Sequence, residues 1–166
     1  MGFIYKDRVP ELIKGYPTRV NTNDIYEGRL SSDSSEGVFG DVVLFADKGF
    51  YKVADTTNTI TSASQIAGVI QATNVKLDMT YGGGVASEVK TEKGGAFNRL
   101  VKGFIALELK AKTDLATIVN GAKVGLTSDG KCELSTAEGA IATDWIFTGV
   151  TSTDDSGRLL AEVEVK

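Results

Sequence analysis

The residues that could do chemistry in this chain are its carboxylates, one thiol and two glycine-rich stretches, because the sequence contains no histidine. This removes the Ser-His-Asp triad, the usual proton shuttle near neutral pH and the commonest transition-metal ligand. Acid and base catalysis would then need two carboxylates held together with separated pKa values. The carboxylates mostly fall in predicted turns or on polar strand faces: Glu36, Asp41, Asp47, Asp55, Glu88, Glu92, Asp129, Glu138 and Asp144. Such positions are typical of solvated surface, and an all-β enzyme that uses carboxylates alone is the least favoured hypothesis.

Two glycine-rich stretches, Tyr81-Gly82-Gly83-Gly84 and Gly94-Gly95, could bring backbone amides close to a phosphate. The lysine and hydroxyl of a phosphate loop are missing, and the first stretch leads into a predicted strand instead of a helix. Asp154-Asp155 has the composition of a loop for hard cations but lacks the spaced oxygens and closing glutamate of a calcium hand. We therefore predict surface turns at these places, with no cofactor and no metal.

The single cysteine and the charge distribution exclude further classes. Cys132 cannot form an internal disulfide and lies in a predicted strand, which indicates a packed thiol. The net charge of −4 is spread along the chain without a basic block, so we predict no direct contact with nucleic acid. No apolar run approaches the roughly 20 residues of a membrane helix, so we predict no membrane association.

An internal repeat relates residues 40–53 to residues 121–134, 81 positions further on. Both copies indicate a strand, a glycine turn and a second strand, and a third strand containing Gly-Val follows each. Three glycine pairs align in the repeat: Gly40 with Gly121, Gly49 with Gly130, and Gly68 with Gly149. Neither copy carries a titratable cluster, so the repeat predicts duplicated scaffold.

From residue 37 onward the pattern is one short strand after another, separated by Gly, Asn, Asp and Ser turns. The longest predicted strand covers residues 98–111, where Gly103, Ile105 and Leu107 alternate with polar positions and leave Phe104 on the polar face. The other predicted strands cover 38–45, 50–54, 65–73, 85–91, two strands of a hairpin within 126–134, one beginning at 145, and 159–166. About nine strands predict an all-β domain, a small β-barrel or β-sandwich, over residues 37–166.

Residues 1–36 differ from the rest, since they carry both prolines, three tyrosines and a serine-rich cluster with poor periodicity. We predict an extended N-terminal arm, with a short helical turn at residues 11–14. Its apolar content exceeds that of disordered segments, so the arm must lie on its own barrel or on a neighbour.

The order of these pieces resembles the cement or decoration proteins of tailed-bacteriophage capsids. The resemblance covers nearly the whole chain and consists of short glycine and valine patterns. They are Glu36-Gly37-Val38-Phe39-Gly40-Asp41-Val42-Val43, Ile66-Ala67-Gly68-Val69-Ile70, Val101-Lys102-Gly103-Phe104-Ile105-Ala106-Leu107, Asn120 to Val124, Ser128-Asp129-Gly130, Phe147-Thr148-Gly149-Val150 and Leu160 to Val165.

The resemblance implies a non-enzymatic virion protein that is assembled in the host cytoplasm and sits on the outer capsid surface. Its partners would be the major capsid protein, whose adjacent subunits it clamps, and itself, as a dimer or trimer. Aromatic side chains suit such contacts because they offer large area on few rotatable bonds. The predicted interface residues are Phe3, Tyr5, Tyr16, Tyr26 and Phe104. The alternative is a ligand-binding β-module, either a carbohydrate-binding domain or a tail or fibre component.

Overall fold

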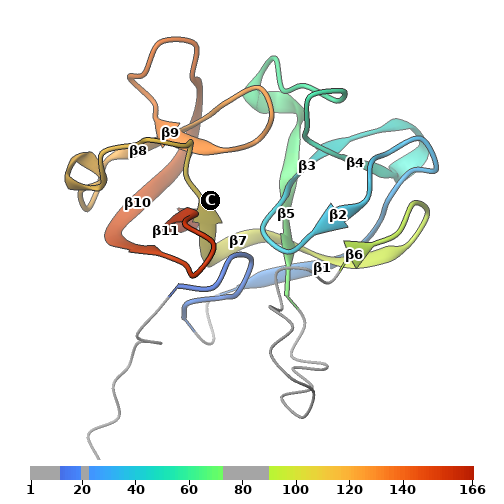
Figure 1. The fold of residues 1–166 in the computed structure, drawn as a ribbon. Coiled ribbons are helices and arrows are strands. Elements are labelled where there is room, and N and C mark those ends of the chain that lie inside the picture. Colours follow the sequence, from blue (N-terminus) through green and yellow to red (C-terminus); the bar gives the residue numbers. More distant parts are fainter. Residues whose placement is uncertain (1–11, 20–22, 73–89) are drawn as a thin grey trace, which may run out of the picture.

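The computed structural model describes residues 12–19, 23–72 and 90–166, which form an all-β fold (Figure 1). Helical structure in these residues is limited to three single 3-10 turns, Asp47–Gly49, Ala63–Gln65 and Leu115–Thr117. The strands are β1 (Asp24–Arg29), β2 (Gly37–Val38), β3 (Val42–Phe45), β4 (Tyr51–Val53), β5 (Ile66–Gln71), β6 (Lys90–Thr91), β7 (Ala96–Glu108), β8 (Lys123–Leu126), β9 (Cys132–Leu134), β10 (Ile141–Thr153) and β11 (Leu159–Val165).

Nine of these strands make one curled antiparallel sheet, in the order β4-β3-β5-β7-β11-β10-β8-β9, with β1 also paired to β7. The short strands β2 and β6 pair with each other. In Figure 1 the strands β3, β4 and β5 lie on one side of the molecule and β8 to β11 on the other, with β7 between the two groups. The curl gives the sheet the shape of half a barrel.

The strand predictions are confirmed in type but not in number, since the described residues contain eleven strands instead of about nine. The unexpected strand β1 lies inside the segment predicted to be an arm and pairs with β7 from Ile25↔Leu100 to Arg29↔Ala96. It was missed because five of its six residues are exposed, so no alternation of buried and exposed residues marks it. Of the strand predicted at 85–91, only Lys90–Thr91 lies within the described residues.

The internal repeat is confirmed for its hairpins. The first hairpin joins β3 to β4, and the second joins β8 to β9 with the same residue pairing 81 positions later. The pairs are Val43↔Val53, Leu44↔Lys52 and Phe45↔Tyr51 in the first, and Val124↔Leu134, Gly125↔Glu133 and Leu126↔Cys132 in the second.

The alignment of the third strand was wrong by four residues. Val42 of β3 pairs with Val69, and its counterpart Lys123 of β8 pairs with Ile146, which lies 77 positions after Val69. Gly149 is therefore not the structural counterpart of Gly68. The cause is the connection before this strand, which is shorter in the second copy, where β10 begins at Ile141 soon after β9 ends at Leu134.

The repeat extends to the first strand of each unit. Leu30, which follows β1, makes a parallel bridge to Tyr51, and Leu109, which follows β7, makes the same bridge to Cys132. The N–H of Leu30 donates to the carbonyl of Gly95 at 3.0 Å, and the N–H of Leu109 donates to that of Leu159 at 2.8 Å. The strand β1 thus corresponds to the second half of β7, so β7 ends the first unit and begins the second.

The main hydrophobic core lies between the two units and takes residues from both, including Leu100, Ile105, Leu126 and Phe147, each fully buried. The predicted burial of Ile105 and Leu107 in β7 is confirmed, but Ala106, predicted on the polar face between them, is also fully buried because it packs in a second cluster on the other face. Two smaller clusters flank this core: one around Leu30, Val43, Ile70 and Phe97, and one of Leu12, Ala106 and Leu160. Leu12 of the second cluster and the backbone hydrogen bonds of Gly15, Tyr16 and Thr18 with Phe104 and Ala106 hold residues 12–19 against β7, so this part of the N-terminal segment lies on its own domain.

Candidate functional site

The residues predicted for an interface lie in different surroundings. Phe3 and Tyr5 lie outside the described residues. Tyr16 is half-buried, with its ring edge-on to Phe39 at 6.2 Å between centroids, and burial raises the pKa of its hydroxyl. Phe104 is half-buried beneath the guanidinium of Arg19, which lies 4.0 Å from the ring centroid. Only Tyr26, at 57% exposure, is open to solvent.

Tyr26 belongs to a row of three aromatic rings and one arginine on four strands, in which Tyr26 and Phe45 are exposed and Tyr51 is half-buried. The guanidinium of Arg99 on β7 lies 5.8 Å from the ring centroid of Tyr26 on β1 and 4.7 Å from that of Tyr51 on β4. The ring of Tyr51 lies 6.1 Å from that of Phe45 on β3, which is 59% exposed. We call Tyr26, Arg99, Tyr51 and Phe45 the aromatic row.

The sheet itself holds this row in place. Tyr26 is the register partner of Arg99, and Phe45 is the register partner of Tyr51. Arg99 is fixed further because its Nη1 donates to the carbonyl of Ala67 at 2.7 Å. Tyr, Phe and Arg are residue types enriched at protein interfaces, and contiguous exposed apolar surface marks such sites. The aromatic row is therefore the best candidate for a contact with another protein.

Sequence reasoning found one member of the row and missed three. The pairing of Phe45 with Tyr51 could have been found, because both residues flank the predicted turn at Asp47–Gly49 and a hairpin places them opposite each other. Arg99 could not be found, since its position depends on the pairing of β7 with the unforeseen strand β1.

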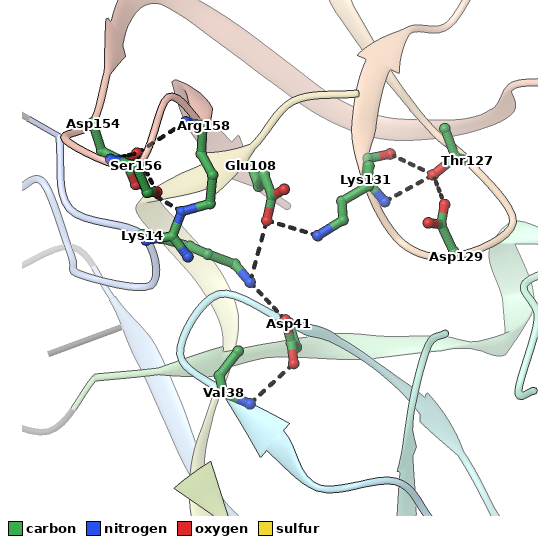
Figure 2. Close-up of polar contacts among 10 residues, drawn as sticks. All are labelled: Lys14, Val38, Asp41, Glu108, Thr127, Asp129, Lys131, Asp154, Ser156 and Arg158. Carbon is green, nitrogen blue, oxygen red and sulfur yellow. Dashed lines mark hydrogen bonds and ion pairs between the residues drawn. The ribbon is translucent and has the colours of Figure 1, made fainter. Parts of the chain in front are cut away.

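A second candidate is a cluster of charges between the two units (Figure 2). The Nζ of Lys14 lies 2.8 Å from Oδ1 of Asp41 and 3.5 Å from Oε2 of Glu108, and Lys131 Nζ lies 2.6 Å from the same Glu108 oxygen. Asp41 also accepts a hydrogen bond from the N–H of Val38 at 2.9 Å. The cluster joins the N-terminal segment, the first unit, the end of β7 and the β8–β9 turn.

A cavity of about 250 Å³ adjoins these charges, and Asp55 and Asp129 also line it. Its two lysines, Lys14 and Lys131, are already paired with carboxylates of the cluster. No group of three or more His, Cys, Asp and Glu residues in the described part of the chain could hold a metal ion. The arrangement is suited to locking the two units together.

A third charged contact fixes the N-terminal segment to β11. Glu162 is only 4% exposed, and its Oε1 accepts hydrogen bonds from Arg19 at 2.9 Å and from the hydroxyl of Thr148 at 2.6 Å. Burial alone would raise the pKa of Glu162, but hydrogen bonding by Thr148, Thr18 and Arg19 and the positive charge of Arg19 together outweigh it, so the pKa is lowered. The two groups that bind the Glu162 carboxylate, Arg19 and Thr148, belong to the same chain, so the contact stabilises the fold.

The remaining reactive group is the thiol of Cys132, which is fully buried in the main core. Burial raises its pKa to about 12, so it is not a nucleophile in the folded protein. Within the described ranges, no helix is long and apolar enough to cross a membrane.

Comparison with known proteins shows a similarity in fold. No protein-family model matches the chain, and no curated protein sequence matches it. Among solved structures, the fold is similar to that of a chain in the capsid of Myoviridae phage XM1, with a TM-score of 0.58 and 19% identity. The match covers 100% of this chain and 98% of that chain. The two chains therefore share a fold from end to end.

Proposed function

We propose that the protein is a non-enzymatic structural component of a bacteriophage virion. It decorates the outer surface of the capsid and stabilises the shell by bridging neighbouring subunits of the major capsid protein. The observation that carries this proposal is the end-to-end similarity in fold to a chain of the phage XM1 capsid. The match leaves almost nothing of either chain uncovered, so the similarity is not confined to one part of the fold.

The aromatic row supplies a contact surface for this role. Burial of apolar surface yields roughly 25 cal/mol per Å², and a decoration protein repeats its contact at every equivalent capsid position. Tyr26 and Phe45 are more than half exposed, so both have surface left to bury. Arg99 between Tyr26 and Tyr51 adds a charge held in a defined place. The proposed partners are the major capsid protein and further copies of this chain.

The internal architecture suits a clamp that must resist force. The main core is shared by both repeat units, and the largely buried ion pairs of Lys14 with Asp41 and Glu108 connect the units. The carbohydrate-binding alternative loses its strongest candidate residue, because Trp145, the single tryptophan, is only 5% exposed and lies in the main core.

The test is binding to capsids that lack the protein. Capsids of the encoding phage are prepared from a mutant with the gene deleted, mixed with increasing amounts of purified protein and sedimented. We expect saturable binding with a fixed number of copies per capsid, and a higher temperature of capsid disruption when the sites are filled. Protein that stays in the supernatant at every concentration would contradict the proposal.

A further inference from the structure

Lys14 differs from every other lysine that forms an ion pair in the described residues. Its side chain is only 4% exposed, whereas the side chains of the others are at least 31% exposed. Its Nζ lies 2.8 Å from Oδ1 of Asp41 and 3.5 Å from Oε2 of Glu108, so the amine is held between two carboxylates (Figure 2). An amine, a carboxyl group and a second carboxylate that can carry protons are the groups that amide formation requires.

The backbone holds the closest pair in place. Gly15 follows Lys14, Gly40 precedes Asp41, and the two glycines pack backbone against backbone. A Cβ on Gly15 would lie 2.4 Å from the nitrogen of Gly40, and a Cβ on Gly40 would lie 2.6 Å from Cγ of Lys14. The N–H of Gly15 also donates to the carbonyl of Ala106 at 2.8 Å. The amine and the carboxyl group are therefore fixed at contact distance by the fold, which is the condition for a high effective molarity.

The surroundings supply the remaining requirements. Oδ2 of Asp41 accepts a hydrogen bond from the N–H of Val38 at 2.9 Å, and such a donor stabilises the negative charge that develops on a carboxyl oxygen under attack. Glu108 is held in place by Lys131, whose Nζ lies 2.6 Å from Oε2. The cavity of about 250 Å³ is lined by Lys14, Asp41 and Glu108, so a released water molecule has a way out.

We propose that Lys14 and Asp41 join in an intramolecular isopeptide bond that the folded protein forms by itself, with Glu108 as the catalytic acid and base. The ammonium group first gives a proton to the Asp41 carboxylate, and burial favours this transfer because it disfavours both charges. The amine nitrogen then attacks Cγ of Asp41. Glu108 takes a proton from the nitrogen and returns it to the leaving hydroxyl. One C–N bond forms, one C–O bond breaks and one water leaves, and no oxidant or cofactor takes part.

The bond closes a loop over residues 14–41 and ties the N-terminal segment covalently to the first unit. Water reaches Asp41 and Glu108, each 19% exposed, but effective molarities of about 10⁵–10⁸ M for well-oriented groups favour closure of the bond in its presence. The ion pair and the bond join the same two residues, so a loss of stability on removal of Lys14 does not distinguish them, whereas mass does. The reaction involves one copy alone and does not rest on the proposed capsid role.

The experiment measures the mass of the intact purified protein in denaturing solvent after incubation at neutral pH, without capsids. We expect a mass one water below that of the unlinked chain. Tryptic digestion should then yield a branched peptide in which residues 9–19 are joined to residues 30–48, because trypsin does not cleave after a lysine whose amine is an amide. A wild-type protein with the full mass of the unlinked chain would overturn the proposal. Water lost at another site, such as a succinimide at Asp129-Gly130, would overturn it too, and the digest separates the two cases.

Variants of the reacting residues assign their roles. Lys14→Met and Asp41→Ala each lack one reactant and should keep the mass of the unlinked chain; a water loss that persists in either would overturn the pairing. Glu108→Gln keeps both reactants and should slow bond formation about 100-fold or more, measured as the linked fraction at set times. Bond formation at the wild-type rate in this variant would overturn the role of Glu108.

Lys110→Met is the matched control. Lys110 forms an ion pair of the same 2.8 Å length with Glu133, but its side chain is 52% exposed and only one carboxylate faces it among the described ion pairs. This variant should still lose one water and yield the same branched peptide. The wild-type mass alone decides whether the bond forms, so the test does not depend on the folding of any variant.

Discussion

The ammonium nitrogen of Lys14 lies 2.8 Å from Oδ1 of Asp41, although the lysine is only 4% exposed. Burial of a charge costs free energy unless a partner and hydrogen bonds compensate for it. Here Asp41 and Glu108 both face the ammonium group, and each carboxylate is partly exposed at 19%. The pair therefore links the N-terminal segment to the first unit and to the end of β7 at a site that water still reaches.

Lys14→Met tests this link. The substitution keeps most of the apolar stem but leaves Asp41 without its closest cation, so we expect a loss of about 2–3 kcal/mol in the free energy of unfolding. Urea denaturation measures it. The control is Lys90→Met, which removes an ion pair to Glu36 in which both side chains are about half exposed or more. That change should cost under about 0.5 kcal/mol. Equal effects of the two substitutions would contradict the importance of the buried pair.

Glu162→Gln tests the second charged contact through pH. The pKa of Glu162 in the folded protein is lowered from its ordinary value of 4.5, since hydrogen bonding by Thr148, Thr18 and Arg19 and the charge of Arg19 together outweigh the effect of burial. A lowered pKa in the folded state contributes stability that is present above pH 4.5 and is lost as the pH falls through the folded-state pKa. The variant lacks this contribution at every pH.

The measurement is the urea midpoint of both proteins between pH 3 and pH 7. We expect the wild-type protein to exceed the variant at neutral pH and the difference to shrink as the solution becomes acidic. Asp55 and Asp154 also have lowered pKa values, so the variant should keep part of the pH dependence. A difference in urea midpoint that stays constant from pH 3 to pH 7 would show that Glu162 is not a source of the pH dependence.

Gly68→Ala tests a close approach between β5 and β7. Gly68 has φ of +144°, and a Cβ there would lie 2.3 Å from the backbone carbonyl oxygen of Leu100. Because that oxygen belongs to a central strand and cannot move freely, we expect a loss of more than about 3 kcal/mol. Gly49→Ala is the control: it has φ of +78° but open space around it, so it should cost about 1 kcal/mol. Similar losses in the two variants would contradict the steric argument.

The thiol of Cys132 should report unfolding. Its pKa of about 12 and complete burial leave almost no thiolate at pH 8, and the reagent has no path to the sulfur. We expect a disulfide reagent such as DTNB to modify the thiol only at the rate of global opening, and immediately in denaturant. Fast labelling of the native protein would show that the main core opens locally at β9.

The sequence predicted the all-β class because strand patterns and glycine turns are local signals. The hairpins at Asp47–Gly49 and around Gly130 were found for this reason. The burial of Ile105 and Leu107 was predicted correctly, but that of Ala106 was not, because both faces of β7 are covered there. The strand β1 was missed since its partner β7 begins 67 positions after Arg29, and a strand exposed on both faces leaves no period-two pattern. The third strand of the repeat was misaligned because both copies contain a Gly-Val pair. The connection before this strand is shorter in the second copy, so the two pairs are not equivalent in the structure.

The candidate site was harder to predict than the fold. Single tyrosines and phenylalanines can be recognised in the sequence as candidate contact residues. The aromatic row, however, depends on the pairing of residues on four strands. The buried pair of Lys14 and Asp41 shows the same limit, because two charged residues in turn-rich segments read as solvated surface. Both the aromatic row and the buried ion pair depend on contacts between residues far apart in the sequence.

Phe45→Ser tests whether the aromatic row binds the capsid. Phe45 is 59% exposed, so the domain gains little from it and should lose less than about 1 kcal/mol in unfolding free energy. If the row is the contact surface, removal of this ring at the interface should weaken capsid binding about 10-fold or more in co-sedimentation.

Val119→Ser is the matched control, since Val119 is an apolar residue with 55% exposure that lies outside the row. Any general effect of lost apolar surface would appear in both variants, whereas an effect confined to Phe45→Ser would assign binding to the face of β3 and β4. Unchanged binding of Phe45→Ser would place the capsid contact elsewhere on the protein.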